Sequence, residues 1–148
     1  MSENLKEFLS VRKKQKFATD VGNDRHAKMQ RIVIDSDIEK GDKDLIKKIK
    51  LNPHILPYFV RKSRAEVPIA GVINGLLISR RIDRMLIGHE NKSIVFIDYK
   101  TDLNKNVFRD KYSKQMNEYS QLLQNVYPDY SIQGFILWLQ DFTLEQIS

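Results

Sequence analysis

The sequence contains no cysteine among its 148 residues. That absence excludes disulfides, thiolate zinc sites and iron-sulfur clusters held by cysteine. No apolar run approaches the roughly 20 residues that a membrane-spanning helix needs, and the first residues lack the apolar core of a secretion signal. The phosphate-binding loop pattern Gly-x-x-x-x-Gly-Lys-Ser/Thr is also missing, so the chain has no motor of that kind. We therefore expect no membrane association and a cytoplasmic location.

The composition is that of one basic domain. A length of 148 residues is enough for a single domain with a substantial core. The 25 Lys and Arg against 19 Asp and Glu give a formal net charge of +6. Clusters of this kind suit a polyanion such as DNA, although each cluster alone is equally consistent with a solvated face. The basic residues gather in Arg12-Lys13-Lys14-Lys16, Lys47-Lys48-Lys50, Arg61-Lys62-Arg64 and Arg80-Arg81-Arg84.

Two extended segments with a turn between them predict a β-hairpin. Residues 76–87 and 93–97 are rich in β-branched and other apolar side chains, and residues 88–92 are turn formers. If the turn is centred near Glu90, Asp83 lies about as far from it as Ile97. Asp83 and Asp98 are then neighbours across the ladder.

These positions point to chemistry on a phosphate. Asp98 and Lys100 are two residues apart on an extended strand, so they share a face, whereas the Tyr99 side chain points to the other. Two close carboxylates repel each other unless a cation lies between them, and the Tyr99 carbonyl is placed to be a further ligand. The ammonium of Lys100 can orient an attacking hydroxide. The alternatives are a solvated Asp-Lys pair at a strand end and two acids that merely decorate a hairpin.

Arginines flank the first of these acids. A scissile phosphate would have to approach beside Asp83, where a guanidinium can pair with it. We therefore expect DNA contacts from Arg80, Arg81 and Arg84.

Four short motifs occur in the order found in a known family. They are Gly22-Asn23-Asp24-Arg25-His26, Ile82-Asp83-Arg84, Asp98-Tyr99-Lys100-Thr101 and Gln115-Met116-Asn117-Glu118-Tyr119. Together they resemble the RecB-type nuclease domain of the PD-(D/E)xK superfamily, found at the C-terminus of the AddA and RecB helicase-nucleases of double-strand break repair. The resemblance spans roughly residues 20 to 140. Each motif is weak alone, and their joint order is the signal.

The resemblance implies a fold, an activity and a set of site residues. The fold would be a restriction-endonuclease-like α/β core, and the activity a Mg²⁺- or Mn²⁺-dependent DNA nuclease, an exonuclease in the first instance. One or two ions would be held by His26, Asp83, Asp98 and the Tyr99 carbonyl, with Lys100 positioning water. Gln115 and Tyr119 would support the site and contact the DNA backbone. The partners would be DNA and a helicase motor in the same or another chain, in a nucleoid-associated setting.

Other interpretations of the same residues stay open. His26 shares a helical face with Met29 and Val33, as a core or surface histidine would. Glu66 can offer a further carboxylate, although a solvated edge position suits it better. The chain as a whole fits a catalytically silent DNA-end-binding module, or a structure-selective endonuclease or resolvase on the same fold.

The element order predicts an α/β protein with a central mixed sheet flanked by helices. Residues 1–20 should form an N-terminal helix or linker arm, and residues 21–148 the nuclease domain. We expect a histidine-bearing helix over 22–34, a basic helix near Ile46, and a short helix that begins at Asn52-Pro53 and is limited by Pro57. Strands should follow over 65–98, with turns or bends at two glycines, and a long helix from about Asp110. The expected apolar stripe of that helix is Tyr112, Met116, Tyr119, Leu123 and Val126. A buried strand is expected at 131–139 and an edge strand at 142–147.

Overall fold

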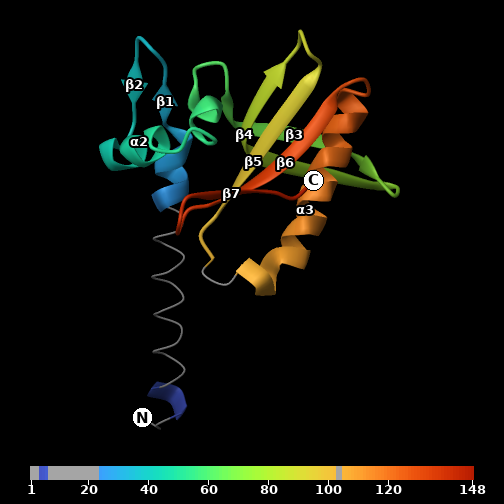
Figure 1. Ribbon diagram of the computed structural model, residues 1–148. Helices are drawn as coiled ribbons and strands as arrows, with labels where there is room; N and C mark the ends of the chain where they lie inside the picture. The colour runs from blue at the N-terminus through green and yellow to red at the C-terminus, as the bar shows by residue number, and fades with distance from the viewer. Residues whose placement is uncertain (1–3, 7–23, 103–104) are drawn as a thin grey trace.

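A mixed five-stranded sheet forms the centre of the protein. The computed structural model describes residues 4–6, 24–102 and 105–148 (Figure 1). Strands β5 and β6 run parallel and the other neighbours run antiparallel, in the order β3-β4-β5-β6-β7. The predicted mixed sheet is therefore confirmed. The strands are β3 (Arg64–Ile73), β4 (Leu76–Gly88), β5 (Ser93–Lys100), β6 (Ser131–Trp138) and β7 (Thr143–Gln146).

Helices lie on both sides of this sheet. Helix α3 (Lys105–Val126) connects the parallel strands β5 and β6 and packs on one face, as a crossover helix does. The other side carries helical residues 24–30, α2 (Lys43–Lys50) and the 3₁₀ helix η1 (Leu56–Phe59) (Figure 1). A small hairpin of β1 (Val33–Ile34) and β2 (Glu39–Lys40) adjoins them. Within the described ranges, no helix combines the length and apolarity needed to cross a bilayer.

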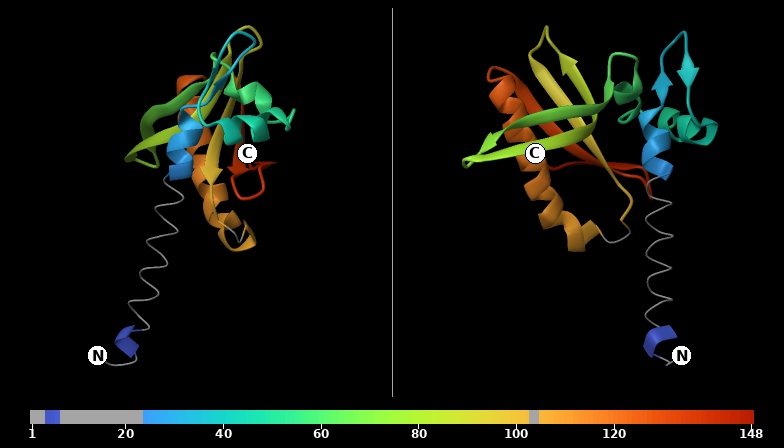
Figure 2. Two further views of the ribbon diagram at one scale, coloured as in Figure 1. Left: turned by 90° about the vertical axis from the view of Figure 1, so that its left-hand side faces the viewer. Right: turned by 180° about the vertical axis from the view of Figure 1, so that it is seen from behind.

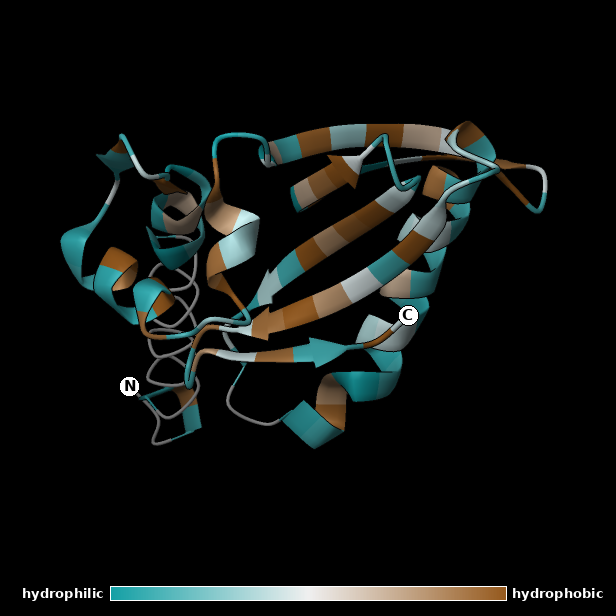
Figure 3. Cartoon of the chain, turned by 45° about the horizontal axis from the view of Figure 1, so that its top comes forward, coloured by the Kyte–Doolittle hydropathy of each residue, from teal (hydrophilic) through white to brown (hydrophobic). Residues whose placement is uncertain are grey.

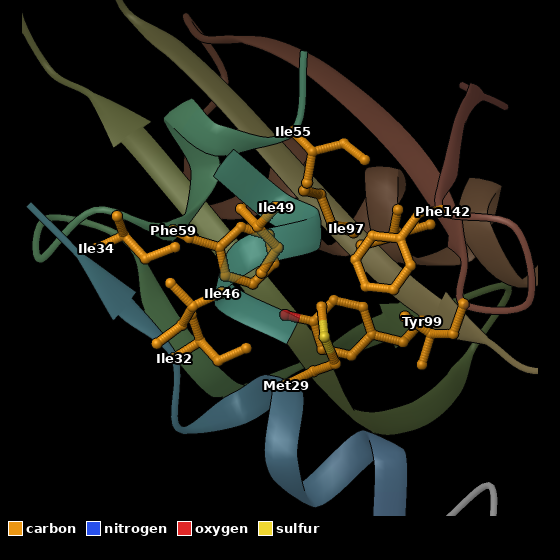
Figure 4. Packing of buried hydrophobic residues seen from close by; sticks show 12 residues of the cluster. Met29, Ile32, Ile34, Ile46, Ile49, Ile55, Phe59, Ile97, Tyr99 and Phe142 are labelled. Carbon is orange, nitrogen blue, oxygen red and sulfur yellow. The ribbon is translucent and has the colours of Figure 1, made fainter. Parts of the chain in front are cut away.

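The two faces of β5 enter two different hydrophobic cores. Ile94 and Phe96 pack with α3, whereas Ile97 and Tyr99 pack with the helices on the opposite side. This alternation follows from the two-residue period of a strand. Figure 3 shows hydrophobic residues concentrated along the central strands, and Figure 4 shows Tyr99 among residues of the second core. Asp98 and Lys100 consequently lie on the face that α3 covers.

Local sequence explains several boundaries. Helix α2 begins after Asp42, whose carboxylate accepts a hydrogen bond from the Leu45 amide at 3.0 Å and so caps the helix. The turn between β3 and β4 has Asn74 at φ 51° and Gly75 at φ 77°. Positive φ at both central positions is typical of a tight hairpin turn, and these two residue types adopt it readily.

The histidine-bearing helix ends earlier than the sequence predicts. Helical backbone covers residues 24–30, and Val33 and Ile34 form strand β1 instead of a last helical turn. The amide of Asp35 donates to the carbonyl of Ile38 at 2.8 Å, which closes the β1–β2 turn. β-branched residues favour that extended pairing. Gly22, the basic run Arg12 to Lys16 and most of the expected arm over 1–20 lie outside the described residues, although residues 4–6 are helical.

Other details of the helices and strands also differ from what the sequence predicts. Helix α3 begins at Lys105 rather than near Asp110, because Phe108 stacks on Tyr112 with ring centroids 5.9 Å apart and Lys105 Nζ contacts Asp141 at 2.6 Å. Its buried stripe includes Leu122 in place of Val126, which is 60% exposed. The short helix expected at Asn52-Pro53 is a turn, followed by η1 with Pro57 in its first turn. Gly71 lies within β3, and the chain turns at Gly75.

Candidate active site

The candidate site lies where β4 separates from β5. The two strands pair from Gly88 opposite Ser93 to Arg84 opposite Ile97. The next residues in this register are Asp83 and Asp98, as the turn position predicts. The Tyr99 amide donates to Asp83 Oδ2 at 2.8 Å, so a side chain satisfies a backbone group at the point where the ladder ends.

Asp83, which is half-buried, and Asp98, which is buried, form an interacting carboxylate pair. Asp98 is 5% exposed. Burial, followed by the nearby charge of Asp98, raises the pKa of Asp83 from 3.8 to about 8. Asp98 Oδ2 lies 2.8 Å from Lys100 Nζ, but among the described residues this buried oxygen accepts no hydrogen bond of normal geometry. Two carboxyl groups thus lie beside one ammonium group, so a further cation would be attracted to this position.

Lys100 is held by residues of α3. Its Nζ donates to Gln115 Oε1 at 3.0 Å, and the amide of Gln115 donates to the Tyr119 hydroxyl at 2.8 Å. Burial, followed by the charge of Asp98, raises the pKa of Tyr119 to about 12, so this hydroxyl is neutral at physiological pH. The structure therefore brings together five predicted residues: Asp83, Asp98, Lys100, Gln115 and Tyr119.

Tyr112 joins this group although the sequence indicates only a core role for it. Its ring lies beneath Lys100, with Nζ 4.3 Å from the ring centroid. Its hydroxyl donates to Asp102, at the end of β5. Burial, together with this bond, raises the pKa of Tyr112. The spacing of the residues could have indicated this position of Tyr112. Tyr112 is one helical turn before Gln115, and Asp102 is two residues after Lys100.

His26, the expected nitrogen ligand, contacts Tyr99 in the structure. Its ring meets the Tyr99 ring edge to face, with centroids 5.7 Å apart, and Tyr99 belongs to the core opposite α3. Within residues 24–102 and 105–148, no three His, Asp or Glu side chains form a group able to hold a metal. The structure thus brings Asp83 and Asp98 together, and it places the His26 ring against Tyr99.

The buried position of Arg84 disagrees with the expectation that this residue contacts DNA. It is 2% exposed, and its guanidinium lies 4.4 Å from the centroid of the Phe59 ring. It donates to the Tyr99 hydroxyl at 2.8 Å, to Ser63 Oγ at 2.8 Å and to the Met29 carbonyl at 3.0 Å. Arg84 therefore ties the sheet to the end of helix 24–30.

The other residues that we expected to contact DNA differ in their exposure to solvent. Arg80 contacts Glu118 of α3 at 2.7 Å, and Arg81 is 66% exposed with Glu66 3.8 Å away. Both arginines can reach solvent. Tyr119 is 4% exposed, so it supports Gln115 and the expectation that it touches the DNA backbone is not met.

Glu66 interrupts the β3–β4 ladder opposite Asp83. Its φ is 52°, and the pairing of β3 with β4 passes from Ala65 directly to Val67. Such an irregularity bends a strand. The side chain of Glu66 is 47% exposed, in keeping with a solvated edge position.

The raised pKa of Asp83 predicts an unusual pH dependence of stability. The folded chain holds this proton more tightly than the unfolded chain, so the contribution of Asp83 to the free energy of unfolding falls as pH rises from about 4 to about 8. The slope is at most about 1.4 kcal/mol per pH unit. Asp83→Asn keeps an acceptor for the Tyr99 amide and removes the titration.

Urea denaturation in chelator checks this prediction. The stability of the wild type relative to Asp83→Asn should decline between pH 5 and pH 8. Asp110→Asn, at an exposed position of α3, is the matched control. A constant difference between wild type and Asp83→Asn over this range would show that the carboxylates are not desolvated as described.

No protein-family model matches the sequence, and no curated protein is similar to it. The function is accordingly proposed from the chemistry of the described side chains.

Proposed function

We propose that this protein is a divalent-metal-dependent deoxyribonuclease with a restriction-endonuclease-like core of the RecB type. The observation that supports it best is the meeting of Asp83, Asp98 and Lys100 where two strands separate. Two carboxylates and an ammonium are the groups needed to hold a cation beside a phosphate and to offset charge there. The chain order of the motifs resembles that family in addition.

The donor set fits a hard divalent cation. Carboxylate and carbonyl oxygens are the ligands that Mg²⁺ and Mn²⁺ prefer. Asp98 Oδ2 is buried without a hydrogen bond among the described residues. Burial, followed by the charge of Asp98, raises the pKa of Asp83, and a cation at this position would favour the charged form of both carboxylates. Asp83, Asp98 and the Tyr99 carbonyl would hold the ion. His26 stays a candidate ligand from the adjoining helix. A bound ion would polarise the phosphate and make a bound water more acidic.

The protein's own residues give Lys100 a defined position. Asp98 and Gln115 fix the ammonium from two sides, and Tyr112 supports it from below. Because the Gln115 amide donates to Tyr119, its carbonyl oxygen is the atom that faces Lys100. A preorganised ammonium stabilises negative charge that develops on a phosphate in the transition state without moving to do so.

DNA is the polyanion that this basic chain would bind. Arg80 and Arg81 lie three and two residues before Asp83, respectively, and are partly solvent-accessible, so they can pair with phosphates. Binding should weaken as salt rises, since phosphate contacts release counterions. By the same resemblance we propose exonuclease action in double-strand break repair, with a helicase motor in the same or a partner chain.

Incubation with end-labelled single- and double-stranded DNA tests the proposal. Cleavage is expected with Mg²⁺ or Mn²⁺ and none with chelator. DNA that is bound but stays intact under every metal condition would instead indicate a silent DNA-end-binding module. Preferential cutting of a branched substrate would favour a structure-selective endonuclease.

A further inference from the structure

The β3–β4 hairpin extends beyond the body of the protein. Gly71 lies against Leu122 of α3, which marks where the hairpin crosses the helix. The chain continues past this crossing to the tight turn at Asn74 and Gly75. Figure 2 shows the end of the hairpin projecting beyond α3.

The projecting end is apolar. Leu77 is 79% exposed, Leu76 is 68% exposed and Val72 is 59% exposed. Neighbouring exposed leucines on a tight turn are unfavourable in water and are typical of a surface that contacts something. Because the turn conformation is defined by positive φ at two residues, the leucines are presented on a preformed support.

The stem below this tip is cationic. Residues 67–82 include no Asp or Glu. Arg80 in this stretch contacts Glu118 of α3 at 2.7 Å, whereas Arg81 is 66% exposed, lies 3.8 Å from Glu66 and can turn toward a phosphate. An apolar end on a basic stem matches a partner that combines phosphates with flat apolar faces. A nucleic acid has both.

Pairing with a second copy is disfavoured at the same hairpin. Strand β3 is the edge of the sheet, and it contains Pro68, which cannot donate to a further strand. Glu66, with φ 52°, breaks the regular edge as well. Both features are devices that protect an edge from pairing with another strand.

We propose that the hairpin end is a wedge for the junction between double- and single-stranded DNA. Leu76 and Leu77 would contact the last base pair, and Arg81 the adjacent phosphates. Aliphatic side chains that insert between bases unstack them in this manner. The inference rests on the proposed function, which it refines: the substrate is a duplex end that must be opened before a strand reaches Asp83 and Asp98.

Fluorescence of 2-aminopurine tests the wedge without any cleavage. The probe is placed at the terminal base pair of a duplex with a single-stranded tail, and the full chain is added in chelator. A several-fold rise in fluorescence is expected for the wild type, because unstacking releases the quenched base. The double variant Leu76→Ser, Leu77→Ser should give almost no rise at saturating protein, with unchanged affinity for a single-stranded oligonucleotide.

Leu51→Ser is the matched control, since Leu51 is 73% exposed at the end of α2. It should behave as the wild type. An equal rise for wild type and double variant, or no rise for either, overturns the wedge. A dimer in sedimentation that the double variant alone dissociates would make the tip an interface between copies, which also overturns it.

The same samples separate this inference from the proposed function. A rise in fluorescence that depends on the two leucines, without cleavage after Mg²⁺ is added, supports the wedge and contradicts the nuclease. Cleavage of single-stranded DNA with no dependence of fluorescence on the leucines supports the nuclease and contradicts the wedge.

Discussion

Asp98→Asn is expected to slow metal-dependent DNA cleavage by roughly a hundred- to a thousand-fold, the range typical of losing one preorganised electrostatic group in an active site. Asparagine keeps the size of the side chain but loses its charge. The site would then hold a cation less tightly, and Lys100 would lose the partner that lies 2.8 Å from its Nζ. Single-turnover rates at saturating DNA and metal measure the loss.

Lys100→Met should give a loss of similar size for a different reason. Methionine retains the aliphatic stem and removes the ammonium, so Gln115 loses a hydrogen bond and the two acids lose their counter-charge. DNA affinity should change little, because the effect falls on the transition state. Asp110→Asn and Lys111→Met, at exposed positions of α3, are matched controls. Undiminished cleavage by a folded Asp98 or Lys100 variant would remove these residues from the chemistry.

Arg84→Met should destabilise the protein by about 3 to 5 kcal/mol, as expected when one member of a buried polar network is removed. Methionine fills much of the volume, but the Tyr99 hydroxyl, Ser63 Oγ and the Met29 carbonyl lose their donor. Chemical denaturation of the purified variant measures the change. Arg84→Lys should recover only part of the loss, since one ammonium cannot reach all three acceptors with the geometry of a guanidinium.

The control for Arg84 is Arg81, three residues earlier in the same strand. Arg81→Met removes a guanidinium from a side chain that is 66% exposed, and its effect on stability should stay within about 0.5 kcal/mol. If the Arg84 and Arg81 variants were equally stable, Arg84 would not be the internal tie between sheet and helix, and a role toward DNA would again be open.

The hairpin and its acids could be predicted from sequence because they depend on local order. A turn near Glu90 fixes the register, and the register brings Asp83 opposite Asp98. The helical spacing of Gln115 and Tyr119 likewise predicts that they are neighbours, and their hydrogen bond at 2.8 Å confirms it. In each case the contact follows from the period of one element or the geometry of one turn.

The features that the sequence could not predict are contacts between segments far apart in the chain. Three neighbouring arginines look alike in sequence, and only packing against Phe59 and helix 24–30 distinguishes Arg84 from Arg80 and Arg81. The position of His26 depends on how its helix meets Tyr99, which no periodicity encodes. The bend at Glu66 is likewise a property of the paired strands rather than of either sequence.

Anomalous diffraction from a crystal soaked in Mn²⁺ tests most directly whether Asp83 and Asp98 share a cation. A shared cation would give a peak at about 2.0 to 2.3 Å from an oxygen of each aspartate, in the range of divalent-metal distances to oxygen ligands. A side chain of His26 or the Tyr99 carbonyl at the same peak would complete the ligand set. The contrary result is a crystal in saturating Mn²⁺ that has metal peaks elsewhere but none between the two carboxylates. It would show that Asp83 and Asp98 do not share a cation.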